Sequence, residues 1–260
     1  MNQQIDRPKQ FSLIPRPPAA SFEEERLHRK QRLAATFRLF ARYGYDKGLA
    51  GHVTVRDPEF PDRYWINPLG QFFGQIKVSD LQLVDHDGNI LFGDRPINKA
   101  GFTIHSALHK ARPDVIAAAH THSVYGKAWS TLGRLLDPLT QDSCAFYEDH
   151  VVFDPFSGVV LTSEEGERLA ESLGDKKAAI LQNHGILTVG PTIEAVAYWY
   201  IALEDTARVQ LLAEAAGTPK PIPHDIAKLT HSQVGSAQGG YYSFQPLWDW
   251  IVAEEPDFLN

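Results

Sequence analysis

Three histidines have the residue type and the spacing of a metal site. His120 and His122 stand two positions apart at the end of a short apolar run, which we expect to form a buried strand. Because side chains alternate across a strand, both imidazoles face the same side and could chelate one ion. A second apolar run, residues 178–181, leads to His184. Three histidines leave coordination positions open, which is typical of a catalytic site. The alternative is that each histidine only hydrogen-bonds to backbone at a strand end.

Other side chains could move a proton or take part in such a site. Glu148 and His150 lie in a segment rich in acidic and aromatic residues, and they are our candidate catalytic residues; a solvated acidic loop is the alternative. His105 and His109 stand four positions apart on a predicted helix, a spacing that can chelate a metal, but packing or exposure is favoured for both. The single cysteine, Cys144, has no activating context and is expected to fill the core.

Around these residues the sequence predicts helices that alternate with short strands. Helical periodicity and capping signals predict helices at 22–43, 98–112, 123–132 and 163–173, and from 192 to just before Gly217. Short apolar or alternating runs predict strands at 52–55, 64–67, 81–84, 90–92, 115–120, 159–161, 178–181 and 185–189. This order predicts an α/β fold, a three-layer α/β/α sandwich with a central, mainly antiparallel sheet.

The two ends of the chain differ from the part between them. Residues 1–20 carry four prolines and no periodicity, so we expect an extended N-terminal arm. Residues 21–217 form the predicted metal-binding domain. Residues 218–260 form a tail with a predicted turn at 239–242 and an aromatic end, which we expect to pack on the domain or on a neighbouring subunit.

Length and charge exclude several classes of protein. The chain has 260 residues, of which 43% are apolar, enough for a sizeable core. Its 25 Lys and Arg against 32 Asp and Glu give a net charge of −7, which disfavours binding to nucleic acid or to an anionic membrane. The longest apolar stretch, residues 195–203, is too short to span a bilayer, and the first residues lack the apolar run of an export signal. Together with the single cysteine, this predicts a cytoplasmic protein.

Several segments, in order along the chain, resemble the class II aldolase/adducin family over about residues 25–217. The segments are Gly51-His52-Val53-Thr54-Val55-Arg56, Ile66-Asn67-Pro68-Leu69-Gly70, His105, Arg112-Pro113-Asp114-Val115, His120-Thr121-His122-Ser123 and Asn183-His184-Gly185. The resemblance implies an α/β/α fold and one divalent metal ion per subunit, zinc, iron(II) or manganese, held by His120, His122 and His184. It also implies a homotetramer with active sites at subunit interfaces. In the sugar-phosphate aldolases of the family, the metal polarises the substrate carbonyl and hydroxyl.

Two departures from the aldolase pattern predict a different substrate. The aldolases have Gly-Asn where this chain has Gly51-His52, and they have paired serines and a catalytic glutamate where this chain has Lys99-Ala100-Gly101. A glycine cannot move a proton, and Lys99 alone offers only a point charge to a phosphate. We therefore expect a small, non-phosphorylated ligand. The candidate substrate-binding residues are His52, Asn67, Lys99 and Tyr125.

Three functions from different classes remain open. The first is a divalent-metal lyase, an aldolase or decarboxylase acting on a small hydroxy- or oxo-acid. The second is a non-haem iron(II) oxygenase that uses the same histidines to cleave an arylpyruvate-like side chain, as some family members do. The third is an adducin-like interaction scaffold without catalysis, which has no use for three convergent imidazoles. In the first two, the partner is a small-molecule substrate.

Overall fold

The computed structural model describes residues 16–154, 156, 158 and 163–260. Its centre is an eight-stranded sheet with the strand order β4-β3-β2-β1-β5-β8-β7-β6. The strands are β1 (His52–Arg56), β2 (Arg63–Ile66), β3 (Gln82–Asp85), β4 (Ile90–Phe92), β5 (Ala117–Thr121), β6 (His150–Phe153), β7 (Ala178–Leu181) and β8 (Gly185–Gly190). Every neighbouring pair is antiparallel except β6 and β7. The predicted, mainly antiparallel sheet is confirmed.

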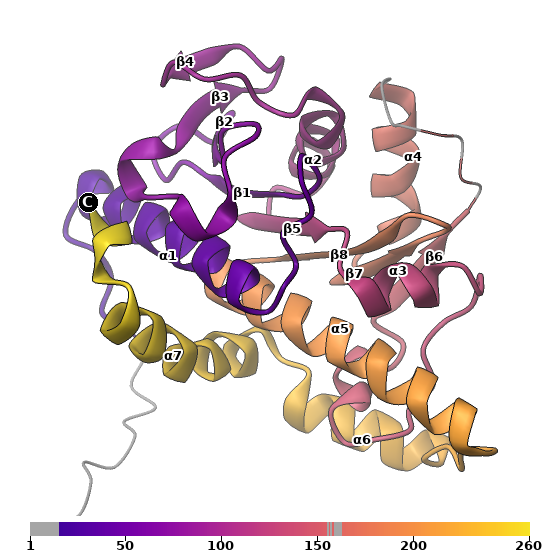
Figure 1. Cartoon of the computed structure of the whole chain (residues 1–260). Helices are drawn as coiled ribbons and strands as arrows, with labels where there is room; N and C mark the ends of the chain where they lie inside the picture. Colours follow the sequence, from indigo (N-terminus) through magenta and orange to yellow (C-terminus); the bar gives the residue numbers. More distant parts are fainter. Residues whose placement is uncertain (1–15, 155, 157, 159–162) are drawn as a thin grey trace, which may run out of the picture.

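Helices cover both faces of this sheet (Figure 1). They are α1 (Phe22–Arg42), α2 (Lys99–Ala111), α3 (Val124–Ser130), α4 (Ser163–Leu173), α5 (Ile193–Ala216), α6 (His224–Val234) and α7 (Ala237–Glu254), with short 3-10 helices at Phe73–Gln75, Val78–Asp80, Ser143–Phe146 and Pro256–Leu259. Helices α2 and α4 pack on one face through Ile104, Leu108 and Leu169. Helices α1, α3, α5 and α7 pack on the other face, which carries the larger hydrophobic core. The three-layer sandwich is thereby confirmed.

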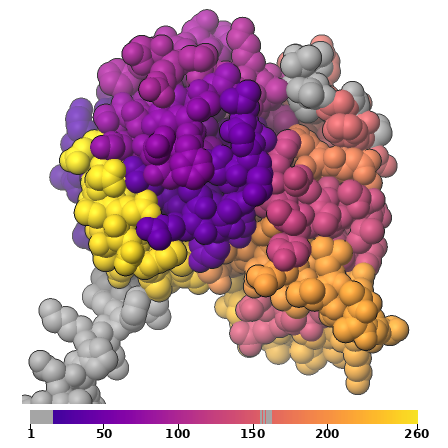
Figure 2. All heavy atoms as spheres, viewed as in Figure 1, coloured from indigo at the N-terminus to yellow at the C-terminus, as the bar shows by residue number. Residues whose placement is uncertain are grey.

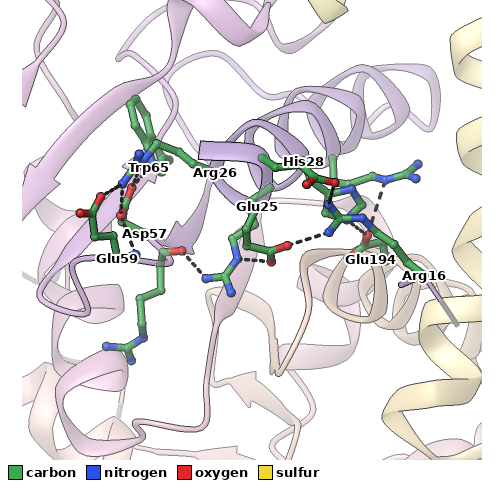
Figure 3. A network of polar contacts seen from close by, with 12 residues as sticks. Arg16, Glu25, Arg26, His28, Asp57, Glu59, Trp65 and Glu194 are labelled. Atoms are coloured by element: carbon green, nitrogen blue, oxygen red, sulfur yellow. Dashed lines mark hydrogen bonds and ion pairs between the residues drawn. The ribbon is translucent and has the colours of Figure 1, made fainter. Parts of the chain in front are cut away.

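Polar contacts hold α1 against the sheet and against α5 (Figure 3). Arg26 Nε donates to Asp57 Oδ2 over 2.7 Å, and the same oxygen accepts from Trp65 Nε1 at 2.9 Å. At the other side of α1, His28 Nε2 lies 2.8 Å from Glu194 Oε1 at the start of α5. These buried contacts fix the helix that starts the domain relative to the central strands.

The C-terminal segment packs on the domain of its own chain. Phe244, Ile251 and Phe258 are fully buried in the larger core. Figure 2 shows this segment, in yellow, lying against the N-terminal part in indigo. Arg38 of α1 donates to Asp257 Oδ2 at 3.0 Å. No helix among the described residues combines the length and apolarity needed to cross a membrane.

The structure corrects the predicted turn at 239–242. These residues lie in the first turns of α7, whose N-cap Ser236 accepts from the Gly239 N–H at 3.0 Å. A Cβ at Gly240 would stand 2.7 Å from Trp199 Nε1, so this glycine lets α7 approach α5 closely. Gly240 therefore serves helix packing here rather than a turn.

Two further predictions also differ from the structure, and two others concern residues that the structure does not describe. The acidic and aromatic segment contains a strand, β6, where the sequence predicts a loop. Ser123 is not the side-chain cap of α3, because its Oγ donates to Glu204 instead. The strand predicted at 159–161 and the arm up to residue 15 lie outside the described residues. Of the arm, Arg16 forms an ion pair with Glu25 at 2.6 Å.

Candidate metal centre

His120, His122 and His184 come together at one edge of the sheet. One ring nitrogen of each lies within 4.8 Å of those of the other two. His122 Nε2 and His184 Nε2 are 3.0 Å apart. His120 lies in strand β5, and His122 directly follows the end of that strand. His184 lies in the connection between β7 and β8. The pairing of β5 with β8, in which Thr121 faces Ile186, brings the two segments side by side.

The rings have the protonation that metal binding requires. His120 Nδ1 donates to the Ile186 carbonyl at 2.8 Å, which leaves Nε2 with its lone pair. That Nε2 is buried and has no hydrogen-bond partner among the described residues. Burial lowers the pKa of His120 well below its ordinary value, and burial together with His122 lowers the pKa of His184 to about 4. Neutral imidazoles that converge with an unpaired nitrogen fit a divalent ion.

The turn that carries His122 is held by α5. Tyr200 OH donates to the Thr121 carbonyl at 2.9 Å and accepts from the Thr121 N–H at 3.1 Å. Glu204 accepts from Ser123 Oγ at 2.6 Å and from two backbone N–H groups that start α3, those of Tyr125 and Gly126, at 2.8 and 2.6 Å. Neither α5 residue is predicted from the sequence. No local pattern marks them, because they act about eighty positions away along the chain.

Two of the predicted substrate-binding residues, His52 and Asn67, are buried, and strand register brings His52 next to the cluster. His52 pairs with His120 across β1 and β5, and their ring centroids are 5.2 Å apart. Asn67 directly follows Ile66, which pairs with Thr54. Its Oδ1 is buried with no hydrogen-bond partner in the described part of the chain.

The other two predicted substrate-binding residues lie differently. Lys99 is exposed at the start of α2. Tyr125 is half-buried on α3, where its ring lies 5.4 Å from the Arg208 guanidinium. The structure does not bring Tyr125 into contact with the three histidines within one subunit.

Glu148 and His150 lie away from the cluster within one subunit. Strands β6 and β7 run in parallel with His150 beside Ala178 and Phe153 beside Leu181, so the Phe153 end of β6 is the one near His184. Both ring nitrogens of His150 are engaged, Nδ1 with the Phe146 carbonyl at 2.6 Å and Nε2 with the Leu136 N–H at 2.9 Å. The catalytic roles of Glu148 and His150 stay predictions.

A small apolar hollow adjoins His184. Its other lining residues are mostly apolar but include a carboxylate: Ile104, Phe153, Phe156, Gly158, Glu165, Leu169, Leu181 and Gln182. Gln182 Oε1 is buried there without a hydrogen-bond partner among the described residues.

Comparison with known proteins gives consistent results. Residues 31–211 match the family model described as "Class II Aldolase and Adducin N-terminal domain". The chain is 48% identical to "Decarboxylase NovR" of Streptomyces niveus, a match that covers 92% of this chain and 90% of that protein. It is also 48% identical to "4-hydroxy-3-prenylphenylpyruvate oxygenase/4-hydroxy-3-prenylbenzoate synthase" of Streptomyces roseochromogenus subsp. oscitans, over 91% of this chain and 86% of that one. Among solved structures, "L-fuculose 1-phosphate aldolase from Glaciozyma antarctica PI12" superposes with a TM-score of 0.89 at 44% identity, covering 95% and 98% of the two chains.

Proposed function

Because this chain belongs to the class II aldolase and adducin family, we propose that it is a divalent-metal-dependent lyase that cleaves a carbon–carbon bond in a small, non-phosphorylated hydroxy- or oxo-acid. Relatives named as a decarboxylase and as an aldolase support an enzyme of the lyase or decarboxylase type. The observation that carries the proposal is the convergence of three neutral imidazoles, those of His120, His122 and His184.

The three histidines and the first turn of α2 have different roles in the proposed site. His120, held by the Ile186 carbonyl, is the buried ligand, while His122 and His184 are half-buried and leave one side of the site open to a substrate. A divalent ion bound there supplies Lewis-acid stabilisation of negative charge on a substrate oxygen. The first turn of α2 presents Lys99, Ala100 and Gly101, which bring no hydroxyl to a phosphate group. This absence of hydroxyl donors supports a carboxylate substrate over a sugar phosphate.

A proton-transfer group has to come from outside one subunit's cluster. In the assembly we propose, a homotetramer with shared sites, Glu148 or His150 of one subunit serves the histidines of the next. Glu148 is the better candidate, since both nitrogens of His150 already form hydrogen bonds.

A second candidate function is an iron(II) oxygenase acting on an arylpyruvate-like acid. It is supported by the name of the 48% identical relative from S. roseochromogenus. It is also supported by Gly101, because oxygen chemistry does not need a carboxylate base at that position. Iron would supply the redox change, and zinc could not replace it.

Metal analysis tests the shared premise of both functions. Protein purified anaerobically without added metal should carry about one divalent ion per subunit, and His184→Ala should remove most of it. His224→Ala is the matched control, because His224 is exposed and lies outside the cluster. Full metal content in His184→Ala would refute the site. For the function itself, turnover of an oxo-acid with zinc under nitrogen supports the lyase, whereas oxygen uptake coupled to substrate loss with iron only supports the oxygenase.

A further inference from the structure

The His52 imidazole fills the space that a side chain at position 101 would need. His52 is 4% exposed, and its ring lies against the first turn of α2. A Cβ built on Gly101 would stand 1.5 Å from His52 Cδ2 and 1.9 Å from His52 Nε2. No side chain fits at position 101 while the imidazole is in place. His52 and Gly101, one residue from each departure from the aldolase pattern, are therefore sterically linked.

A buried hydrogen-bonded chain lies behind the His52 ring. The His105 ring meets His52 edge to face, with centroids 4.4 Å apart. Thr54 Oγ1 is 2.7 Å from His105 Nδ1 and 2.9 Å from His109 Nε2. His109 Nδ1 in turn lies 3.1 Å from the Val115 carbonyl.

His109 Nδ1 lies 3.1 Å from the Val115 carbonyl and 3.5 Å from Arg56 Nη2. A carbonyl only accepts, so the shorter contact makes His109 Nδ1 the donor, and its Nε2 then accepts from the Thr54 hydroxyl. The Thr54 oxygen then accepts from His105 Nδ1, which leaves His105 Nε2 with a lone pair. Burial lowers the pKa of both histidines, to about 3 for His109, which keeps the two rings neutral.

Where this hydrogen-bonded network approaches the metal centre, three buried ring nitrogens lie close to one another in the sequence of rings. His105 Nε2, His52 Nδ1 and His120 Nε2 are all buried without a hydrogen-bond partner in the described residues. Such groups are unfavourable unless a ligand, a water or an ion pairs with them. The order of the rings, from His109 through His105 and His52 to His120, leads to the three predicted ligands.

We propose that His52 is the specificity-determining residue of this site. Its ring takes the space of a side chain at position 101 and hydrogen-bonds to an oxygen of an oxo- or hydroxy-acid bound beside the three histidines. His105 and Thr54 are positioning residues that hold the ring. This inference rests on the proposed function, because it requires a carboxylate ligand at the histidine cluster.

Oxalate, a two-carboxylate mimic of an oxo-acid, is the probe for the ligand role. Calorimetric titration of the zinc-loaded full chain should give at least about ten-fold weaker oxalate binding in His52→Ala, with the zinc content unchanged. His105→Leu should also weaken binding. His105→Asn should restore it, since an asparagine amide can donate to Thr54 from about the position of Nδ1. His224→Ala is again the control that should bind like the wild type.

The shared space is tested on the metal-free protein by a double-mutant cycle. Gly101→Ala alone should lower the melting temperature by about 5 °C, because the methyl group collides with His52. In the His52→Ala background the same change should cause no loss, since alanine favours a helix over glycine. An equal fall in melting temperature in both backgrounds would overturn the steric conflict between His52 and a side chain at position 101.

The outcomes separate this inference from the proposed function. If the wild type binds zinc and oxalate, and His52→Ala binds oxalate equally well, only the role of His52 is overturned. If the wild type binds no metal, the proposed function fails and the ligand role of His52 fails with it, while the cycle still decides the steric pairing. Loss of zinc from His52→Ala would make the residue part of the metal centre and would also overturn the proposal.

Discussion

Glu204→Ala is a test of how the fold supports the metal centre. Glu204 is 3% exposed and accepts three hydrogen bonds around the turn that follows His122. At ~1.5 kcal/mol net for each hydrogen bond to a charged acceptor, their loss should lower the free energy of unfolding by about 4 kcal/mol. For a chain of this size that corresponds to a fall in melting temperature of roughly 10 °C.

The same change should also weaken metal binding. The turn at residues 121–123 would keep its contacts with Tyr200 but lose those with Glu204, so His122 would be held less firmly, and affinity for zinc should drop about ten-fold or more. Thermal unfolding without metal and a zinc titration measure the two effects separately. Asp205→Ala is the matched control, since Asp205 is the exposed neighbour in the same helix. A Glu204→Ala variant that melts within about 2 °C of the wild type and binds zinc equally well would refute the reasoning.

Three further results are expected. Fuculose, rhamnulose and ribulose phosphates should show no turnover above background with zinc or manganese, because Gly101 cannot act as a base; cleavage at ~1 per second or faster would mean that another residue supplies it. Burial lowers the pKa of His109 to about 3, so the unfolded chain takes up its proton first. The melting temperature of the metal-free protein should therefore fall as pH drops from about 6.5 to about 3, and less steeply in His109→Gln; equal slopes would contradict this. Phe258→Ala, which empties a fully buried site in the core, should cost about 3–5 kcal/mol in chemical denaturation, and a loss below about 1 kcal/mol would show that the tail does not stabilise the domain.

Much of the architecture follows from local patterns. Period-two alternation and short apolar runs predicted most of the strands, and the cap Ser21 marks the start of α1 within one residue. The sheet order does not follow from such patterns, since β5 lies between β1 and β8 through contacts distant in sequence. The strand β6 was missed because acidic and aromatic residues surround it. The two glycines of α7 suggest a turn until the contact of Gly240 with Trp199 is seen.

The same division applies to the site. The spacing of His120 and His122, with a later histidine at a strand end, predicts the cluster because strand geometry fixes the direction of side chains. The supports of the cluster come from α5 and have no signal in the local sequence. The link between His52 and Gly101 also lay hidden, since it is a collision in space between residues 49 positions apart and not a motif.

The long separation of the ligands has a consequence for the kinetics of folding. His122 and His184 are 62 residues apart, and they meet only once β5 has paired with β8. A chain that has formed only local helices and hairpins therefore offers an ion no site, because the closure of this long loop must come first. An ion that binds only the completed site enters after the rate-limiting step, so it would slow unfolding and leave the folding rate unchanged. Bound metal would then lengthen the lifetime of the native state, whereas the rate of folding would depend on the pairing of the strands alone.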